Sequence, residues 1–327
     1  MRLGVSIPVE EKLSAQRLVE LAKLAERGGF DTVVAGEVQG PEAMALLGAV
    51  AVSTERITIG TGVVGMQPRG ATMTGMGFAT LASLAPGRVW AGIGVSSPMV
   101  VEQWHGREFA APLQYVREYV PHLRKTLDGE RLDSGFKLTL DNEHRVPIVL
   151  AAMRPKMIEL AGEVADGVFL TWCPPDEAEE RVALARRGAE RAGKNPDDLL
   201  VIVSFFAYAG PETDAALDRM RRYLVQYGCV PTHRDSFIGT MKNLDAVGEA
   251  WARGDRKGAL ELVSDDEVRH ITVVGGAEDV VRRAAEYHAA GIDLPIMVAT
   301  AARQGDELGP FATVEAVGKL LVEGGHA

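Results

Sequence analysis

The chain has 327 residues, a formal net charge of -10, and 46% hydrophobic and 24% charged residues. This is the composition of a soluble globular protein, and its acidic balance excludes nucleic acid as a general partner because phosphate binding needs a basic face. Two cysteines cannot build a disulfide framework and indicate a reducing compartment. No long apolar stretch opens the chain and no run is long enough to span a bilayer, so we predict a cytoplasmic protein without a membrane partner.

Short apolar runs alternate with helical patterns from the first residues onward. Residues 3–7 predict a strand, and Ser14 is the expected cap of the helix that follows. The buried face of that helix is predicted to hold Leu18, Leu21, Ala22 and Ala25. A second strand at 32–35, a helix at 41–52 and a third strand from Ile57 continue the alternation.

The same helix-to-strand junction occurs three times, at residues 25–31, 161–170 and 289–298. Each places a helix end, a small residue and an aspartate before an apolar strand. Repeated junctions of this kind indicate stacked βα units.

Eight strands are predicted, and eight strands separated by helices favour a closed (β/α)8 (TIM) barrel over an open sheet. The predicted strands are residues 3–7, 32–35, 57–62, 89–94, 147–151, 167–170, 200–207 and 294–299. We expect a single domain over residues 1–327, with helical insertions at about 98–142 and 211–267 over the barrel mouth. In this fold the chemistry lies at the carboxyl ends of the strands.

Several common chemistries match the sequence poorly. Gly60 to Gly65 fits the G-x-G-x-x-G dinucleotide pattern, but no helix begins at once and no acidic residue lies about 20 positions on to hold a ribose. The seven histidines are scattered, without the spacing of a metal site. No G-x-S-x-G nucleophile motif is present. We therefore predict no metal.

The stretch between Arg56 and Val101 contains no acidic residue but includes Arg69 and Arg88. An anion would be tolerated there, although buried parallel strands are also poor in charge for structural reasons. Arg69 is therefore a candidate for binding the cofactor.

Four motifs carry a family resemblance: residues 53–63 (STERITIGTGV), 81–94 (LASLAPGRVWAGIG), 104–106 (WHG) and 161–170. With them the chain resembles the bacterial-luciferase-like family of TIM barrels, in particular its coenzyme F420 (deazaflavin) dependent oxidoreductases. Residues 275–280 and 290–291 extend the resemblance toward the end of the chain.

The resemblance implies several cofactor-binding residues. A non-prolyl cis peptide at Gly62-Val63 would support the tricyclic ring, the alternative being an ordinary trans strand end. Gly94, Val95 and Ser96 after the fourth strand, and Met153 and Arg154 after the fifth, match positions that hold the ring and the phosphate-bearing tail. For Arg154 a surface charge is an equal alternative.

The chain departs from the family pattern where a proton donor is expected. Ser96-Ser97 stands where related enzymes often carry Gly-Glu, and Met153-Arg154 replaces glycines. Glu37, at the end of the second strand, is our first candidate for the catalytic acid, and His105 is the second. A structural ion pair and a satisfied core histidine are the respective alternatives.

The resemblance implies hydride transfer between a deazaflavin and a small organic substrate. The alternatives are an FMN-dependent luciferase-like monooxygenase and a non-catalytic deazaflavin-binding protein. The family often dimerises, and we hypothesise a homodimer through the apolar helices near 41–52 and 71–84. An apolar substrate pocket is expected from Met66, Trp104, Trp172, Phe205 and Phe206, the alternative being that these residues belong to the core.

Overall fold

The computed structural model describes residues 1–141 and 143–324. Residue 142 at the end of the first predicted insertion and residues 325–327 at the end of the predicted domain lie outside the described residues. Within the described ranges, no helix combines the length and apolar character needed to cross a bilayer.

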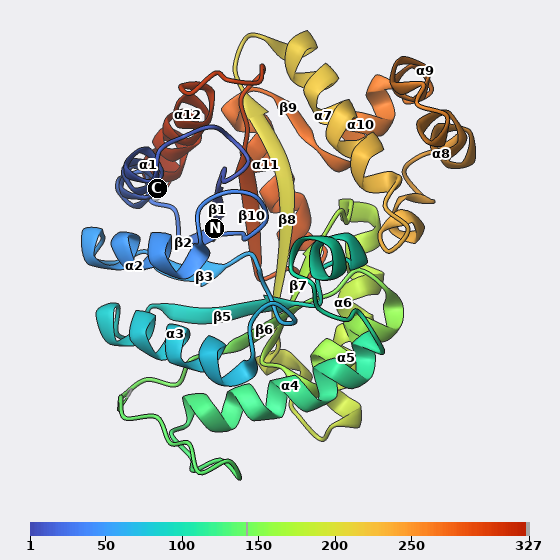
Figure 1. Cartoon of the computed structure of the whole chain (residues 1–327). Coiled ribbons are helices and arrows are strands. Elements are labelled where there is room, and N and C mark those ends of the chain that lie inside the picture. Colours follow the sequence, from blue (N-terminus) through green and yellow to red (C-terminus); the bar gives the residue numbers. More distant parts are fainter. Residues whose placement is uncertain (142, 325–327) are drawn as a thin grey trace.

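Eight parallel strands of the described chain close into a barrel (Figure 1). They are neighbours in chain order, and the last strand pairs with both the first strand and its own predecessor. In this closing register Met297 lies opposite Val5 on one side and Phe205 on the other. The strands are β1 (Gly4–Ile7), β2 (Thr32–Ala35), β3 (Thr58–Thr61), β5 (Val89–Gly94), β6 (Ile148–Ala151), β7 (Gly167–Thr171), β8 (Leu200–Ala209) and β10 (Leu294–Ala299). The predicted (β/α)8 fold is confirmed.

Two further strands were not predicted. β4 (Val64–Gly65) pairs with β5, and β9 (Val273–Gly275) pairs with the far end of β8. Runs of two or three residues are too short to show strand periodicity in the sequence.

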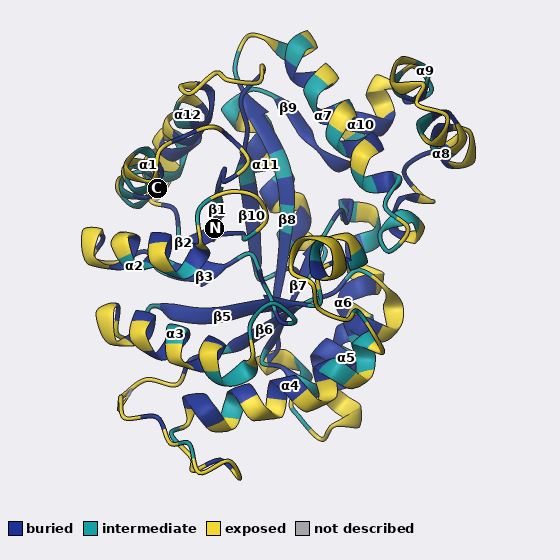
Figure 2. Cartoon of the chain, viewed as in Figure 1, coloured by how far each residue is buried: buried dark blue, intermediate teal, exposed yellow. Residues whose placement is uncertain are grey.

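Helices cover the outside of the barrel, and their inward faces are buried while their outer faces are exposed (Figure 2). The first helix begins as predicted, because the Ser14 side chain accepts a hydrogen bond from the Arg17 amide at 3.3 Å. Its four predicted core residues are all fully buried. The outer helices are α1 (Ala15–Arg27), α2 (Ala43–Ser53), α3 (Ala71–Leu84), α4 (Pro112–Leu127), α5 (Pro155–Val164), α6 (Pro175–Arg191), α11 (Ala277–Ala289) and α12 (Gly309–Gly324).

The two predicted insertions are helical. The first holds η1 (Met99–Trp104), a π-helix, ahead of α4. The second forms a group to one side of the barrel in Figure 1. It comprises α7 (Thr213–Gly228), η3 (Arg234–Phe237), α8 (Leu244–Ala252), α9 (Arg256–Glu261) and α10 (Asp265–Ile271), and a short helix η2 (Pro196–Asp198) precedes β8. The division into one domain with two insertions stays a prediction.

The barrel interior is filled by large side chains, among them Trp90 and Phe169, whose ring centroids are 6.2 Å apart. Gly60 provides the space for Trp90, since a Cβ atom there would lie 2.1 Å from the indole ring. The first glycine of the dinucleotide-like pattern therefore serves packing inside the barrel. This explains why the pattern occurs here without a nucleotide-binding helix.

Candidate active site

A cavity of about 220 Å³ opens at the carboxyl ends of the barrel strands. Every strand of the barrel contributes to its lining, which extends from Ser6 on β1 around to Val298 on β10. The cavity therefore occupies the position at which TIM barrels carry out their chemistry.

One side of this cavity is bare main chain, which we call the glycine wall. A Cβ atom at Gly62 would lie 2.9 Å from Val34 Cγ2, and one at Gly94 would lie 2.9 Å from Val63 Cγ2. The Gly62-Val63 peptide bond is cis, as the resemblance predicted. The glycine wall consists of Gly36, Gly62, Gly65 and Gly94.

The other side carries aromatic side chains, which we call the aromatic wall and define as Trp172, Phe206 and Tyr227. Trp172 stacks on Phe206 with centroids 4.9 Å apart and planes 25° apart, and its centroid lies 4.9 Å from that of Tyr227. Phe237 supports Trp172 from behind at 5.4 Å. A planar apolar molecule would find a matching surface here.

The two walls face each other across the barrel. The glycine wall comes from the ends of β2, β3, β4 and β5, whereas the aromatic wall comes from the ends of β7 and β8 and from α7. In the closed ring of eight strands, β2 lies opposite β7 and β3 lies opposite β8. The space between them is therefore bounded by glycine backbone on one side and by aromatic rings on the other.

Two lining residues adopt a left-handed backbone that non-glycine residues rarely use. Ser96 has φ of 61° and Trp172 has φ of 49°. Among the described non-glycine residues, the one further case is Ala111, just before α4. Such conformations persist where the surrounding structure requires them and are concentrated at functional sites. Their occurrence on both sides of the cavity supports its identification as the functional site.

Glu37 lines the cavity as predicted, but it is engaged in an ion pair. Arg69 donates to its two carboxylate oxygens at 2.7 and 3.0 Å, and also pairs with Glu42 at the start of α2. The Ala43 amide donates to Glu37 at 3.3 Å. This bidentate geometry ties the loop after β4 to the end of β2.

The other predicted proton donor, His105, ends η1 and is exposed. The cavity lining does not include it. The role of each predicted donor stays a prediction, but the structure brings only Glu37 to the cavity.

The predicted cofactor-binding residues divide into two groups. Gly62, Val63, Gly94 and Ser96 line the cavity. Arg69, Val95, Met153 and Arg154 do not: Val95 packs on the main core, Met153 packs on the core beneath α7, and Arg154 pairs with Asp235 at 2.9 Å. The ion pair of Arg154 links the end of β6 to the second insertion.

The predicted substrate pocket is only partly correct. Trp172 and Phe206 line the cavity. Trp104 is 39% exposed, and Phe205 and Met66 belong to the buried core outside the cavity. Alternation along β8 explains why Phe205 is buried while Phe206 lines the cavity, because neighbouring residues of a strand point to opposite faces.

Glu10, which sequence reasoning missed, also lines the cavity. Burial raises the pKa of its carboxyl group, the hydrogen bond to its own backbone opposes this, and Glu11 adds to the rise. The side chain is nevertheless exposed, because solvent reaches it through the open cavity. The sequence signal that could have identified Glu10 is its position three residues after the end of β1, since strand ends carry the chemistry of this fold.

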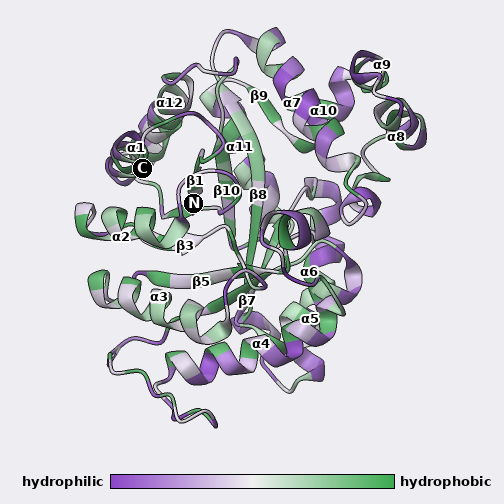
Figure 3. Ribbon diagram, in the orientation of Figure 1, coloured by the Kyte–Doolittle hydropathy of each residue, from purple (hydrophilic) through white to green (hydrophobic). Residues whose placement is uncertain are grey.

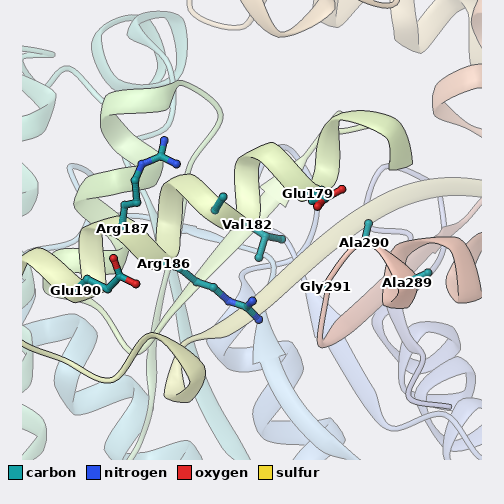
Figure 4. Close-up of a pocket in the computed structure, with 9 residues that line it drawn as sticks. Glu179, Val182, Arg186, Arg187, Glu190, Ala289, Ala290 and Gly291 are labelled. Carbon is teal, nitrogen blue, oxygen red and sulfur yellow. The ribbon is translucent and has the colours of Figure 1, made fainter.

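In the described ranges, no group of three His, Cys, Asp or Glu side chains could hold a metal ion. A second depression lies outside the barrel, between α6 and the turn after α11 (Figure 4). There Arg186 extends from α6 toward Gly291, and Glu179 and Glu190 flank it. Its lining includes no strand end and no cavity residue, so we do not assign the chemistry to it.

Comparisons with known proteins show the family and the fold of the chain. The sequence model of a family described as luciferase-like monooxygenase matches residues 1–294. A Mycobacterium tuberculosis protein, named provisionally as a coenzyme F420-dependent oxidoreductase, is 29% identical over an alignment 335 residues long, which covers 93% of this chain and 96% of that protein. The 5,10-methylenetetrahydromethanopterin reductase of Methanolobus tindarius is 28% identical over 291 residues, covering 84% and 88% of the two chains. The solved structure of the coenzyme F420 dependent tetrahydromethanopterin reductase of Methanopyrus kandleri superposes with a TM-score of 0.78 at 20% identity, over 99% of both chains.

Proposed function

Because the chain belongs to the luciferase-like monooxygenase family, we propose that it is an enzyme that uses coenzyme F420 to transfer a hydride to or from a small organic substrate. One relative that spans most of the chain is named as F420-dependent and another as a reductase. The structural observation that carries the proposal is the cavity at the strand ends, in which bare backbone faces aromatic rings.

The cavity fits the ring system of a deazaflavin. Pockets for drug-sized ligands have volumes of roughly 300–1,000 Å³, whereas this cavity has about 220 Å³. It therefore suits a planar ring and leaves a longer tail outside. The glycine wall lets such a ring approach the main chain closely, because side chains there would fill the space.

The remaining cofactor-binding residues are proposed to hold the tail. Ser96 lies at the edge of the cavity, and Val95 precedes it. The α5 helix begins at Pro155, directly after Met153 and Arg154, without a side-chain cap. Proline has no N-H and the Met157 amide already donates to the Arg154 carbonyl, so the Lys156 N-H at the positive end of the helix is proposed to receive a phosphate. Arg69 is proposed to contribute to cofactor binding indirectly, because its ion pair with Glu37 holds the loop that follows Gly65.

A bound deazaflavin supplies a carbon atom that accepts or donates a hydride. The protein positions the substrate against the aromatic wall and excludes water from the reacting atoms. Tyr227 lines the cavity, and its phenol, whose pKa burial raises above the ordinary 10, is proposed to donate a hydrogen bond to a substrate oxygen.

Fluorescence titration of the purified apoprotein with F420 and with FMN tests the proposal. We expect saturable binding of F420 with weaker or no binding of FMN, followed by turnover with an aldehyde or ketone. Tight FMN binding without F420 binding would contradict the proposal. Binding without turnover of any carbonyl compound or alcohol would favour the carrier protein considered from the sequence.

The description of the matching family favours a second candidate, an FMN-dependent monooxygenase. Such an enzyme would consume oxygen in the presence of reduced FMN and substrate. Oxygen-electrode measurements separate the candidates, since hydride transfer by a deazaflavin does not require oxygen.

We also propose a homodimer formed through α2 and α3. These neighbouring helices are apolar on their outer side, where residues are both exposed in Figure 2 and hydrophobic in Figure 3. Val52 is 68% exposed, Met73 61% and Leu84 43%. Clustered apolar exposure of this kind is typical of an interface. Sedimentation at micromolar concentration should give a dimer, and Val52→Glu with Met73→Glu should give a monomer; a monomeric wild-type protein would contradict the proposal.

A cytoplasmic location is proposed as well. The two cysteines are free, which is typical of a reducing compartment. Cys173 is buried, and desolvation raises its thiol pKa to about 12. Cell fractionation with an antibody to the chain tests the location directly.

A further inference from the structure

Two adjacent acids after β1 have different environments. The Glu11 side chain is 5% exposed and pairs with Arg219 at 2.6 Å. All five N-H groups of Arg219 have acceptors, because it also donates to Tyr223 and to the carbonyls of Ala301 and Arg303. Arg219 therefore neutralises Glu11 and has no donor left for Glu10.

Glu10 instead lies in the cavity between the two walls. It shares the lining with Gly62 and Val63 on one side and with Tyr227 on the other. Among the described residues, the hydrogen bond that constrains its carboxyl group comes from its own backbone. Glu37, the second carboxyl group in the lining, is held by Arg69, and His105 is outside it.

We propose that Glu10 is the catalytic acid and base of this site, donating a proton to the substrate during reduction and accepting one during oxidation. The inference rests on the proposed hydride-transfer function. Glu10 is proposed as a catalytic residue because it lines the cavity that is assigned to the cofactor and the substrate.

The proton and hydride transfers can be written for both directions of the reaction. In reduction, a C–H bond of the reduced deazaflavin would break and its hydride would form a new C–H bond at the carbonyl carbon, while the electron pair of the C=O π bond moves to the oxygen and the cofactor becomes oxidised. The Glu10 O–H bond breaks as the oxygen gains the proton, which leaves a carboxylate and an alcohol. In oxidation, the Glu10 carboxylate takes the hydroxyl proton as the carbon gives its hydride to the oxidised cofactor.

The charges around Glu10 support the acid form. Glu11 in the same loop, Glu37 at the end of β2, and Arg219, Tyr223 and Tyr227 on α7 are the titratable groups that surround it. Burial raises the pKa of Glu10 most, the hydrogen bond to its own backbone lowers it, Glu11 raises it and Arg219 lowers it, and the net direction is upward. Since water reaches Glu10 in the open cavity, this rise should increase when a ligand displaces the water.

Carboxyl ¹³C NMR of glutamate-labelled protein tests the proposal without turnover. The Glu10 signal is the one absent from Glu10→Gln, and with F420 bound we expect it to titrate above the ordinary value of 4.5. Titration at or below that value with F420 bound overturns the proposal, whether or not a substrate is known.

Kinetics with reduced F420 and benzaldehyde as the probe supply the second measurement. We expect the wild-type rate to fall as pH rises through the pKa of Glu10, and Glu10→Gln to lower kcat about 100-fold or more without this pH dependence. Glu20→Gln, on the exposed side of α1, is the matched control and should behave as wild type. A Glu10→Gln enzyme that keeps the wild-type rate and pH profile overturns the proposal.

The outcomes separate this inference from the proposed function. If the wild-type protein binds no F420, the function itself fails and the inference fails with it. If the wild-type protein binds F420 and Glu10→Gln binds it equally well without losing rate, only the role of Glu10 fails.

Discussion

The glycine wall and the aromatic wall differ in how the chain builds them. The glycine wall uses main chain from residues 36 to 94, on neighbouring strands. The aromatic wall uses side chains from residues 172 to 227, including one from an insertion outside the barrel. A surface of backbone suits a ligand of constant structure, such as a cofactor. A surface of side chains can differ between enzymes that act on different substrates. The four predictions below test this division.

The largest effect is expected at Gly92 on β5, behind the glycine wall. A Cβ atom there would lie 1.8 Å from the Thr61 carbonyl oxygen, which belongs to the backbone and cannot move aside. Gly92→Ala should lower the free energy of unfolding by about 3 kcal/mol, measured by urea denaturation. Gly48→Ala in α2 is the control, because nothing lies within 4 Å of its Cβ position, and it should be neutral or stabilising. Equal stability of Gly92→Ala and wild type would show that the β3–β5 contact is not tight.

Closing the cavity from the glycine wall should remove cofactor binding. A side chain at Gly94 would extend between Val63 and Ala151, both of which line the cavity. We expect Gly94→Leu to weaken F420 binding about 100-fold, or about 2.7 kcal/mol, in a fluorescence titration. Unchanged affinity would mean that the ring does not lie against this wall.

Glu26 makes the free energy of unfolding dependent on pH, because it binds the backbone just before β3, the strand that leads to Gly62. Burial raises the pKa of its carboxyl group, but hydrogen bonds from the amides of Ile57, Arg56 and Glu55 outweigh this and lower it below the ordinary 4.5. The folded pKa is below the unfolded one, so the stabilisation is complete above pH 4.5 and is lost as the pH falls through the folded pKa.

Glu26→Gln should therefore cost about 1.5 kcal/mol at pH 7 and should lose less stability on acidification than wild type. Urea denaturation at several pH values measures both effects. Parallel stability curves for the two proteins would contradict the assignment.

The smallest effect is expected on the aromatic wall. Phe206→Leu keeps an apolar side chain but removes the stacking on Trp172 and the contact with Tyr223. We expect a loss of about 1 kcal/mol in stability and a rise of about fivefold in the KM for benzaldehyde. The Kd for F420 should stay the same, because the cofactor is assigned to the opposite wall. An equal loss in both affinities would remove the distinction between the walls.

Much of the fold could be predicted from the sequence alone. The eight barrel strands, the Ser14 cap and the buried stripe of α1 follow from local periodicity and capping, which depend on near neighbours in the chain. Gly62 and Gly94, which the sequence places at strand ends, line the cavity, whereas Gly60 and Gly92 in the same two runs serve packing within the barrel wall. β4 and β9 escaped prediction because two or three residues carry no periodic signal.

Only the tertiary structure shows which of the glutamates near the strand ends are paired with an arginine. In the sequence, Glu10, Glu11 and Glu37 are equivalent carboxyl groups near strand ends. Arg219 is 208 residues from Glu11 and Arg69 is 32 residues from Glu37, so the fold alone brings each guanidinium to its acid. The electrostatic energy of a carboxylate depends on which charges lie within a few ångströms. The chain order therefore fixed where the barrel and its bare backbone would form, and the packing of distant segments decided which carboxyl group remained free in the cavity.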